Sequence, residues 1–127
     1  MRYALILEDT RKDAKVATEV LTKAGIVDIQ LMDNVPAAVF RLNEVMEGKH
    51  KAPDLLLVDL SFPTDSGFEV LRLWKSNPQL IKIPLVVWTQ MGKTEQKLCD
   101  YFGVTKIVSK YDGRQGLERA VAALIQS

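Results

Sequence analysis

Acidic side chains follow predicted strands at two points of this 127-residue sequence. Leu55–Val58 is a continuous apolar run, typical of a strand buried on both faces, and it ends directly on Asp59. An earlier apolar run, Tyr3–Leu7, ends on the pair Glu8 and Asp9. A carboxylate at the end of a parallel strand lies where open α/β sheets bind their ligands. Taken alone, however, Asp59 is also a favoured turn residue that would cap the following loop.

Two further polar residues close other predicted strands. Thr89 ends the run Leu85–Thr89, and Lys110 follows a short strand predicted over residues 106–109. Because the ends of parallel strands lie on one edge of the sheet, three acids, a hydroxyl and a lysine would converge there. Three neighbouring carboxylates repel one another unless a cation lies among them. Oxygen ligands with room for water favour Mg²⁺ over Ca²⁺, so the pattern predicts a magnesium site.

The elements that must position these residues alternate five times between strand and helix. Strands are predicted over residues 3–7, 28–32, 55–58, 85–89 and 106–109. Helices are predicted over residues 10–24, after Asn34, from Ser66 to the residue before Asn77, over 94–102, and at the C-terminus. Asn34 is expected to cap its helix, and the spacing of Ser66 and Glu69 predicts a capping box. Such alternation predicts a parallel sheet covered on both faces, a three-layer α/β domain.

Composition and charge exclude several classes of protein. Apolar residues make up 47% of the chain and charged residues 26%, as in an ordinary globular domain. The formal net charge is only +1 and no long block of like charge occurs, which argues against direct binding to nucleic acid or anionic membranes. No apolar run approaches the roughly 18 residues of a membrane span. The lone cysteine, Cys99, fits a reducing compartment, so we expect a cytoplasmic protein.

Three local signals are better explained as structural than as functional. Gly92-Lys93-Thr94 imitates the end of a phosphate-binding loop, but the first glycine of that motif would fall at Val87. His50 has no second histidine or cysteine near it in sequence, which favours a surface residue over a metal ligand. Cys99 has no identifiable histidine partner, which favours a packing residue over a nucleophile.

The ordered set of strand-end residues resembles the receiver domain of two-component response regulators. The resemblance covers the whole chain, residues 1–127, as a stand-alone receiver domain. It is carried by the acid pair Glu8-Asp9, the segment from Asp59 to Pro63 with Gly67 four residues on, Thr89 after an apolar strand, and Lys110. It implies a flavodoxin-like (βα)5 fold, a three-layer sandwich whose five parallel strands have the order 2-1-3-4-5.

The resemblance also implies how the acidic residues act. Asp59 would be the phospho-acceptor, forming an aspartyl phosphate, which is a recognised covalent intermediate. Mg²⁺ would be held by Asp9, Asp59 and the backbone carbonyl of Ser61, with Glu8 acting through water.

Thr89 and Lys110 would contact the phosphoryl group once it is bound. Thr89 would bind a phosphoryl oxygen, and the Lys110 ammonium, expected at a solvent-facing position, would pair with the phosphoryl group. Catalysis of phosphoryl transfer consists mainly of positioning and charge neutralisation, which these residues and Mg²⁺ would provide. The added charge of roughly −1.5 to −2 would displace the Thr89 hydroxyl and its loop, and that displacement would be the switch.

Several positions depart from the family pattern or tune it. Ile107 stands where the family usually has a switching Tyr or Phe, which puts the usual aromatic output signal in doubt. Lys110 is followed by Tyr111 where a cis proline is usual, so the isomer of this peptide stays open. Gln90 replaces a small residue and should narrow access to the site, together with Met91. Ser61 occupies the position that tunes the lifetime of the phosphoryl group in receivers.

The function implied is phosphorelay signal transduction. A histidine kinase or histidine phosphotransfer protein would donate the phosphoryl group. With no output domain after Ser127, the signal would leave through a protein partner on the fourth helix, fifth strand and fifth helix of a monomer or weak dimer. The protein would act only on its own phosphorylation, so we do not class it as an enzyme.

Two alternative functions stay open. The first is a pseudo-receiver, a binding module of the same fold that works without phosphorylation. The departures at Gln90, Ile107 and Tyr111 favour it slightly, but the complete set of acids, threonine and lysine disfavours it. The second is a small phosphohydrolase with an Asp nucleophile. Such enzymes typically place a second Asp two residues on, where this chain has Ser61.

Overall fold

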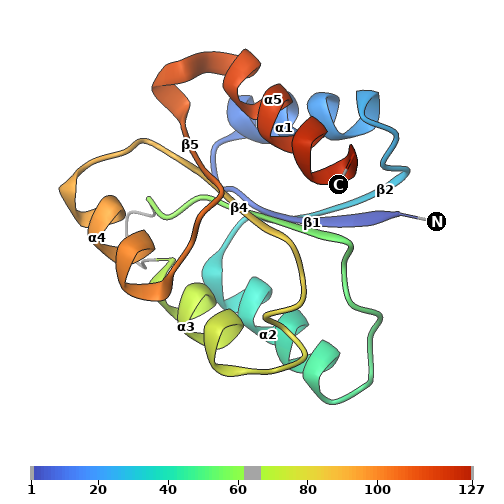
Figure 1. Cartoon of the computed structure of the whole chain (residues 1–127). Coiled ribbons are helices and arrows are strands. Elements are labelled where there is room, and N and C mark those ends of the chain that lie inside the picture. The colour runs from blue at the N-terminus through green and yellow to red at the C-terminus, as the bar shows by residue number, and fades with distance from the viewer. Residues whose placement is uncertain (1, 62–66, 127) are drawn as a thin grey trace.

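The computed structural model describes residues 2–61 and 67–126 of the chain. Strands and helices alternate along it (Figure 1). The strands are β1 (Tyr3–Leu7), β2 (Asp28–Met32), β3 (Leu55–Val58), β4 (Leu85–Thr89) and β5 (Ile107–Ser109). The helices are α1 (Arg11–Lys23), α2 (Val35–Met46), α3 (Phe68–Ser76), α4 (Lys93–Phe102) and α5 (Gly113–Gln126), and a 3-10 turn, η1 (Lys110–Asp112), precedes α5.

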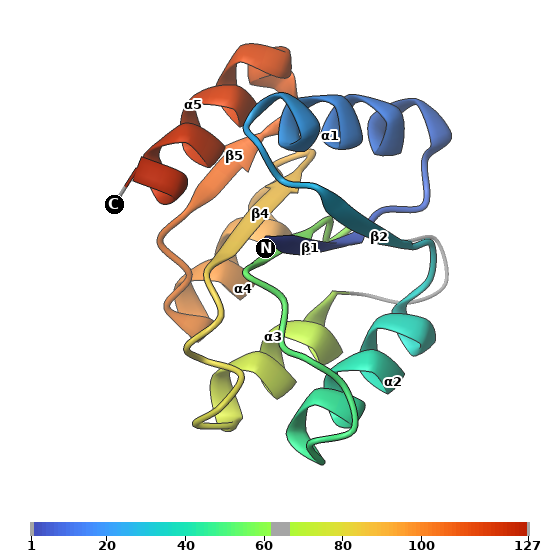
Figure 2. The same cartoon turned by 90° about the vertical axis from the view of Figure 1, so that its right-hand side faces the viewer.

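The five strands form one parallel sheet in the order β2-β1-β3-β4-β5, which confirms the predicted flavodoxin-like topology. Helices cover both faces of this sheet: α1 and α5 lie on one side, and α2, α3 and α4 on the other (Figure 2). The three predicted layers are therefore present. No helix within the described ranges is long and apolar enough to cross a membrane.

Most helix ends agree with the sequence-based predictions. Asn34 caps α2 as expected, because its Oδ1 accepts the Ala37 N–H at 2.8 Å. Helix α4 ends at Phe102 and is capped by Gly103, whose φ of 68° is a conformation that glycine adopts without a steric cost. Helix α3 begins at Phe68, directly after Gly67. Ser66, the residue expected to cap α3, lies outside the described residues.

The strands send alternate side chains into two apolar clusters. Residues packed against α2, α3 and α4 include Leu5, Leu56 and Val87, whereas Ala4, Leu57 and Trp88 belong to the cluster under α1 and α5. Burying each large aliphatic side chain contributes about 1.5–3 kcal/mol, so this apolar interior stabilises the fold. Within the described chain, the buried polar or charged residues are Glu8, Asp59 and Thr89. All three lie at the carboxyl edge of the sheet.

Candidate functional site

The parallel register of the sheet brings the acids of two strands together. Leu7 pairs with Val58 across β1 and β3, and the next residue on β3, Asp59, donates its N–H to the Leu7 carbonyl at 3.0 Å. Glu8, Asp9 and Asp59 each place a carboxylate oxygen within 4.8 Å of the others. Three oxygen donors at this spacing fit a hard divalent cation, as the sequence predicts.

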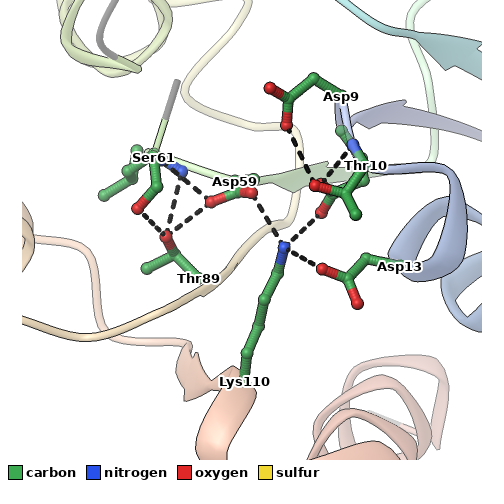
Figure 3. Close-up of polar contacts among 9 residues, drawn as sticks. Asp9, Thr10, Asp13, Asp59, Ser61, Thr89 and Lys110 are labelled. Atoms are coloured by element: carbon green, nitrogen blue, oxygen red, sulfur yellow. Dashed lines mark hydrogen bonds and ion pairs between the residues drawn. The ribbon is translucent and has the colours of Figure 1, made fainter. Parts of the chain in front are cut away.

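The three acids differ in their surroundings. Glu8 and Asp59 are 2% and 3% exposed, whereas Asp9 lies at the surface. One Glu8 oxygen, Oε2, accepts the Thr10 N–H at 3.1 Å, and Thr10 Oγ1 donates to Asp9 Oδ1 at 3.5 Å. The loop from β1 to α1 therefore holds both acids, with Glu8 buried and Asp9 on the exposed side of the site; Figure 3 shows Asp9 beside Thr10.

Both carboxylate oxygens of Asp59 are engaged. Oδ1 accepts the Thr89 hydroxyl at 2.6 Å and the Ser61 N–H at 3.0 Å, and Oδ2 accepts from Lys110 Nζ at 2.9 Å (Figure 3). Thr89 also lies 3.1 Å from the Ser61 hydroxyl and accepts the Leu60 N–H at 3.4 Å. The predicted phospho-acceptor, the predicted hydroxyl and the predicted lysine thus meet in one hydrogen-bonded cluster.

The Lys110 ammonium is enclosed by carboxylates, so its expected solvent-facing position is wrong. The lysine side chain is 10% exposed, and its Nζ contacts Glu8 at 2.8 Å, Asp13 at 2.7 Å and Asp59 at 2.9 Å. It also lies 5.1 Å from the centre of the Trp88 ring, a cation–π distance. The first turn of α1, which carries Asp13, covers the ammonium and removes it from solvent.

Asp13 is the residue of this site that sequence reasoning missed. It lies four residues after Asp9, in the first turn of α1, and its place close behind the acid pair was the available signal. An acid in the first turn of a helix is usually explained by its favourable interaction with the helix dipole, so the sequence alone gives no reason to assign it a functional role.

The charge cluster changes the acidity of its members. The pKa of the Glu8 carboxyl is raised to about 7, chiefly by burial; the Lys110 ammonium opposes the rise, and the neighbouring Asp59 carboxylate contributes to it. For Lys110, burial by itself lowers the pKa, but hydrogen bonds to Asp13, Glu8 and Asp59 raise it above its ordinary value. Lys110 therefore remains protonated and supplies a permanent positive charge.

The positions that depart from the family pattern lie outside this hydrogen-bonded cluster. The Lys110–Tyr111 peptide is trans, since the described residues contain no cis peptide bond, and the Tyr111 ring is 76% exposed. Ile107 is half-buried and packs against the cluster under α2, α3 and α4. Gln90 is exposed and Met91 half-buried, and no hydrogen bond among the described residues involves Gln90. The tuning roles of Gln90, Met91 and Ser61 stay predictions, as does the Ser61 carbonyl ligand.

Comparisons with known proteins identify the family. A family model described as the response regulator receiver domain matches residues 4–122. The chain belongs to the response regulator receiver family. The chain is also 33% identical to the response regulator Rcp1 of Synechocystis sp. over 103 residues, 79% of this chain and 69% of Rcp1. It is 25% identical to the chemotaxis protein CheV1 of Helicobacter pylori over 123 residues, although it spans only 37% of that protein.

Solved structures of family members agree with this fold. The bacteriophytochrome response regulator AtBRR superposes with a TM-score of 0.78 at 25% identity, over 98% of this chain and 92% of that one. The Mn²⁺-bound form of Rcp1 superposes with a TM-score of 0.72 at 26% identity, over 98% and 91% of the two chains. Receiver domains bind a divalent metal at an acidic site, and the cluster of Glu8, Asp9 and Asp59 fits that property.

Proposed function

We propose that the protein accepts a phosphoryl group on Asp59 from a histidine kinase or histidine phosphotransfer protein, in a Mg²⁺-dependent reaction. The observation that carries the proposal is the position of the buried Asp59 carboxylate. It lies between the Thr89 hydroxyl at 2.6 Å and the Lys110 ammonium at 2.9 Å, beside Glu8 and Asp9. An aspartate with a purely structural role does not require a buried hydroxyl, a lysine and two further acids around its carboxylate.

In the proposed reaction, an Asp59 carboxylate oxygen attacks the phosphorus of a phosphohistidine. The new P–O bond forms as the donor's P–N bond breaks, and the electron pair of that bond goes to the imidazole nitrogen. The Lys110 ammonium then pairs with one phosphoryl oxygen and the Thr89 hydroxyl donates to another. Asp9, Asp59 and the Ser61 carbonyl would hold Mg²⁺, with Glu8 acting through water, and the bound ion would neutralise charge on the phosphoryl oxygens.

The output surface in this proposal is the face formed by α4, β5 and α5. One aromatic side chain is exposed beside this face: Tyr111 of η1, the turn between β5 and α5, is 76% exposed. Exposed aromatic residues are enriched at protein interfaces, which supports a protein partner here. We further propose that the protein works in the cytoplasm as a monomer or weak dimer, without contacting nucleic acid. It would catalyse only its own phosphorylation and dephosphorylation.

Intact-mass measurement with Mg²⁺ and a small acyl phosphate or phosphoramidate tests the proposal. The wild-type protein should gain one phosphoryl group, and Asp59→Asn should gain none. Asp54→Asn is the matched control, because Asp54 precedes the same strand, is exposed and lies at its opposite end. Loss of uptake in both variants, or in neither, would contradict the assignment of Asp59.

Metal titration tests the second half of the proposal. Mg²⁺ should bind weakly, with a dissociation constant on the order of a millimolar, because few protein ligands serve an ion that dehydrates reluctantly. Asp9→Asn should weaken metal binding and phosphorylation together. Unchanged phosphorylation in that variant would remove Asp9 from the metal site. A wild-type protein that takes up no phosphoryl group at saturating Mg²⁺ would instead be a pseudo-receiver.

A further inference from the structure

The Lys110 ammonium has already committed every hydrogen-bond donor that it possesses. An ammonium carries three N–H groups and no acceptor, and here three carboxylates surround it, from Glu8, Asp13 and Asp59 (Figure 3). A phosphoryl oxygen that binds this ammonium must therefore displace one of the three. Which carboxylate gives way decides how readily the site accepts phosphoryl groups.

Asp13 does not perform the structural task that its position suggests. It is the third residue of α1, where an acid can accept the N–H of the capping residue. That N–H, of Thr10, is instead accepted by Glu8 Oε2 at 3.1 Å. Asp13 Oδ2 contacts Lys110 Nζ at 2.7 Å, across 97 residues of sequence. The carboxylate thus connects the start of α1 to the turn after β5.

We propose that Asp13 is a positioning residue that restrains the Lys110 ammonium and competes with the incoming phosphoryl group for it. This inference rests on the proposed function of Asp59. The Asp13 side chain is 26% exposed, whereas the side chains of Glu8 and Asp59 are 2% and 4% exposed. Asp59 itself receives the phosphoryl group, so the competition lies between Glu8 and Asp13. A released Asp13 carboxylate regains water, whereas a Glu8 carboxylate that loses Lys110 would remain buried with the Thr10 N–H as its partner. Asp13 is therefore the partner that gives way.

The charge of Asp13 also opposes the arrival of an anion. The carboxylates of Glu8, Asp13 and Asp59 contact the Lys110 ammonium, and that of Asp9 lies within 4.8 Å of Glu8 and Asp59, so acidic groups outnumber the single ammonium before a metal binds. A phosphoryl oxygen on the same ammonium would lie within about 5–6 Å of the Asp13 carboxylate, since each hydrogen bond spans about 2.8 Å. Like charges at that distance repel, so Asp13 slows phosphorylation.

The test compares rates of phosphoryl uptake from a small acyl phosphate at saturating Mg²⁺. Asp13→Asn should speed uptake by about threefold to tenfold, because a neutral amide oxygen holds the Lys110 ammonium less strongly and one negative charge is removed. Asp13→Glu keeps the charge and should stay near the wild-type rate. Glu19→Gln is the matched control: it removes one charge from an exposed position of the same helix, about 9 Å further along. It should leave the rate unchanged.

Two further measurements separate this role from a merely structural one. Asp13→Asn should also bind beryllofluoride, a phosphoryl mimic, severalfold more tightly, which the loss of a helix-stabilising charge would not produce. If Asp13→Asn folds poorly, Asp13→Ser makes the same charge change with a residue that suits a helix start.

If folded Asp13→Asn and Asp13→Ser take up the phosphoryl group no faster than the wild type, Asp13 does not have the proposed role. The proposed function of Asp59 would still stand, provided that the wild type is phosphorylated. Failure of the wild type to take up a phosphoryl group would overturn both.

Discussion

The two ends of β3 carry the same residue type in opposite circumstances. Asp54, at the amino end, is exposed, and its Oδ2 accepts the Tyr3 N–H at 2.9 Å while its own N–H donates to the Tyr3 carbonyl at 2.8 Å. Asp59, at the carboxyl end, is 3% exposed and shares its oxygens with Thr89, Ser61 and Lys110.

The difference shows that surroundings, not residue type, separate a structural acid from a functional one. Asp54 extends the hydrogen bonding between β1 and β3 by one amide, and its charge stays in water. Asp59 is buried beside Glu8, and both carboxylates share the single Lys110 ammonium, so the two negative charges repel each other. The amino end of β3 therefore stabilises the sheet, whereas the buried charges at its carboxyl end destabilise the fold but form the candidate reactive site.

Replacing Lys110 should have the largest effect on this balance. Lys110→Ala leaves the buried carboxylates of Glu8 and Asp59 without their counter-charge, so metal-free protein should lose about 2–4 kcal/mol of unfolding free energy at neutral pH. Chemical denaturation in a chelator measures this, with the exposed Lys106→Ala as the control. Divalent metal should restore part of the loss. Equal stability of the two variants would mean that the ammonium does not hold this edge together.

Glu8 should make the metal-free protein less stable as the pH rises. Because burial raises the Glu8 pKa to about 7 in the folded protein, above its ordinary value, the folded state favours the protonated form. The resulting stability is fully present below the unfolded pKa and is lost as pH rises through about 7. Glu8→Gln should abolish that loss and be more stable than wild type at pH 8 by about 1–3 kcal/mol. Parallel pH profiles for the two proteins would contradict this account.

The amino end of β3 should respond modestly and only in stability. Asp54→Ala leaves the Tyr3 N–H without its acceptor and should cost about 0.5–1.5 kcal/mol, as measured by thermal or chemical unfolding. Asp54→Asn keeps an oxygen in the same place and should cost less. Neither variant should alter metal affinity or phosphoryl uptake. A change in either property would show that the two ends of the strand are not independent.

Replacing Gln90 should have the smallest effect of these substitutions, and it should change only the rates of phosphorylation and dephosphorylation. If its exposed side chain overhangs the site, Gln90→Ala should speed both phosphorylation by small donors and hydrolysis of the phosphorylated form by about twofold to threefold. Metal affinity should stay unchanged, because Gln90 supplies no ligand. Slower hydrolysis in the variant would mean that the amide orients the attacking water. Two unchanged rates would show that Gln90 points away from the site.

Much of this site could be predicted because strand ends are readable from sequence. Continuous apolar runs mark buried parallel strands, and the residue after each run must lie on the common edge, which places Glu8, Asp59 and Thr89. The fold order followed from the family resemblance and is confirmed. Asp13 could not be placed in the same way, because its contact with Lys110 depends on how the start of α1 packs against the turn after β5. The same packing explains why Lys110 is enclosed, not solvent-facing.

The most direct test of the central claim is the position of the phosphoryl group along the chain. Protein phosphorylated by a small acyl phosphate can be reduced with borohydride, which converts an aspartyl phosphate into homoserine, and the peptides can then be mapped by mass. Homoserine at position 59, with an intact Asp54 and an intact Asp9, is the predicted result. Modification at Asp54 or Asp9, or no modified acid in protein that has gained the phosphoryl mass, would contradict the account of β3 as a strand with one structural and one reactive end.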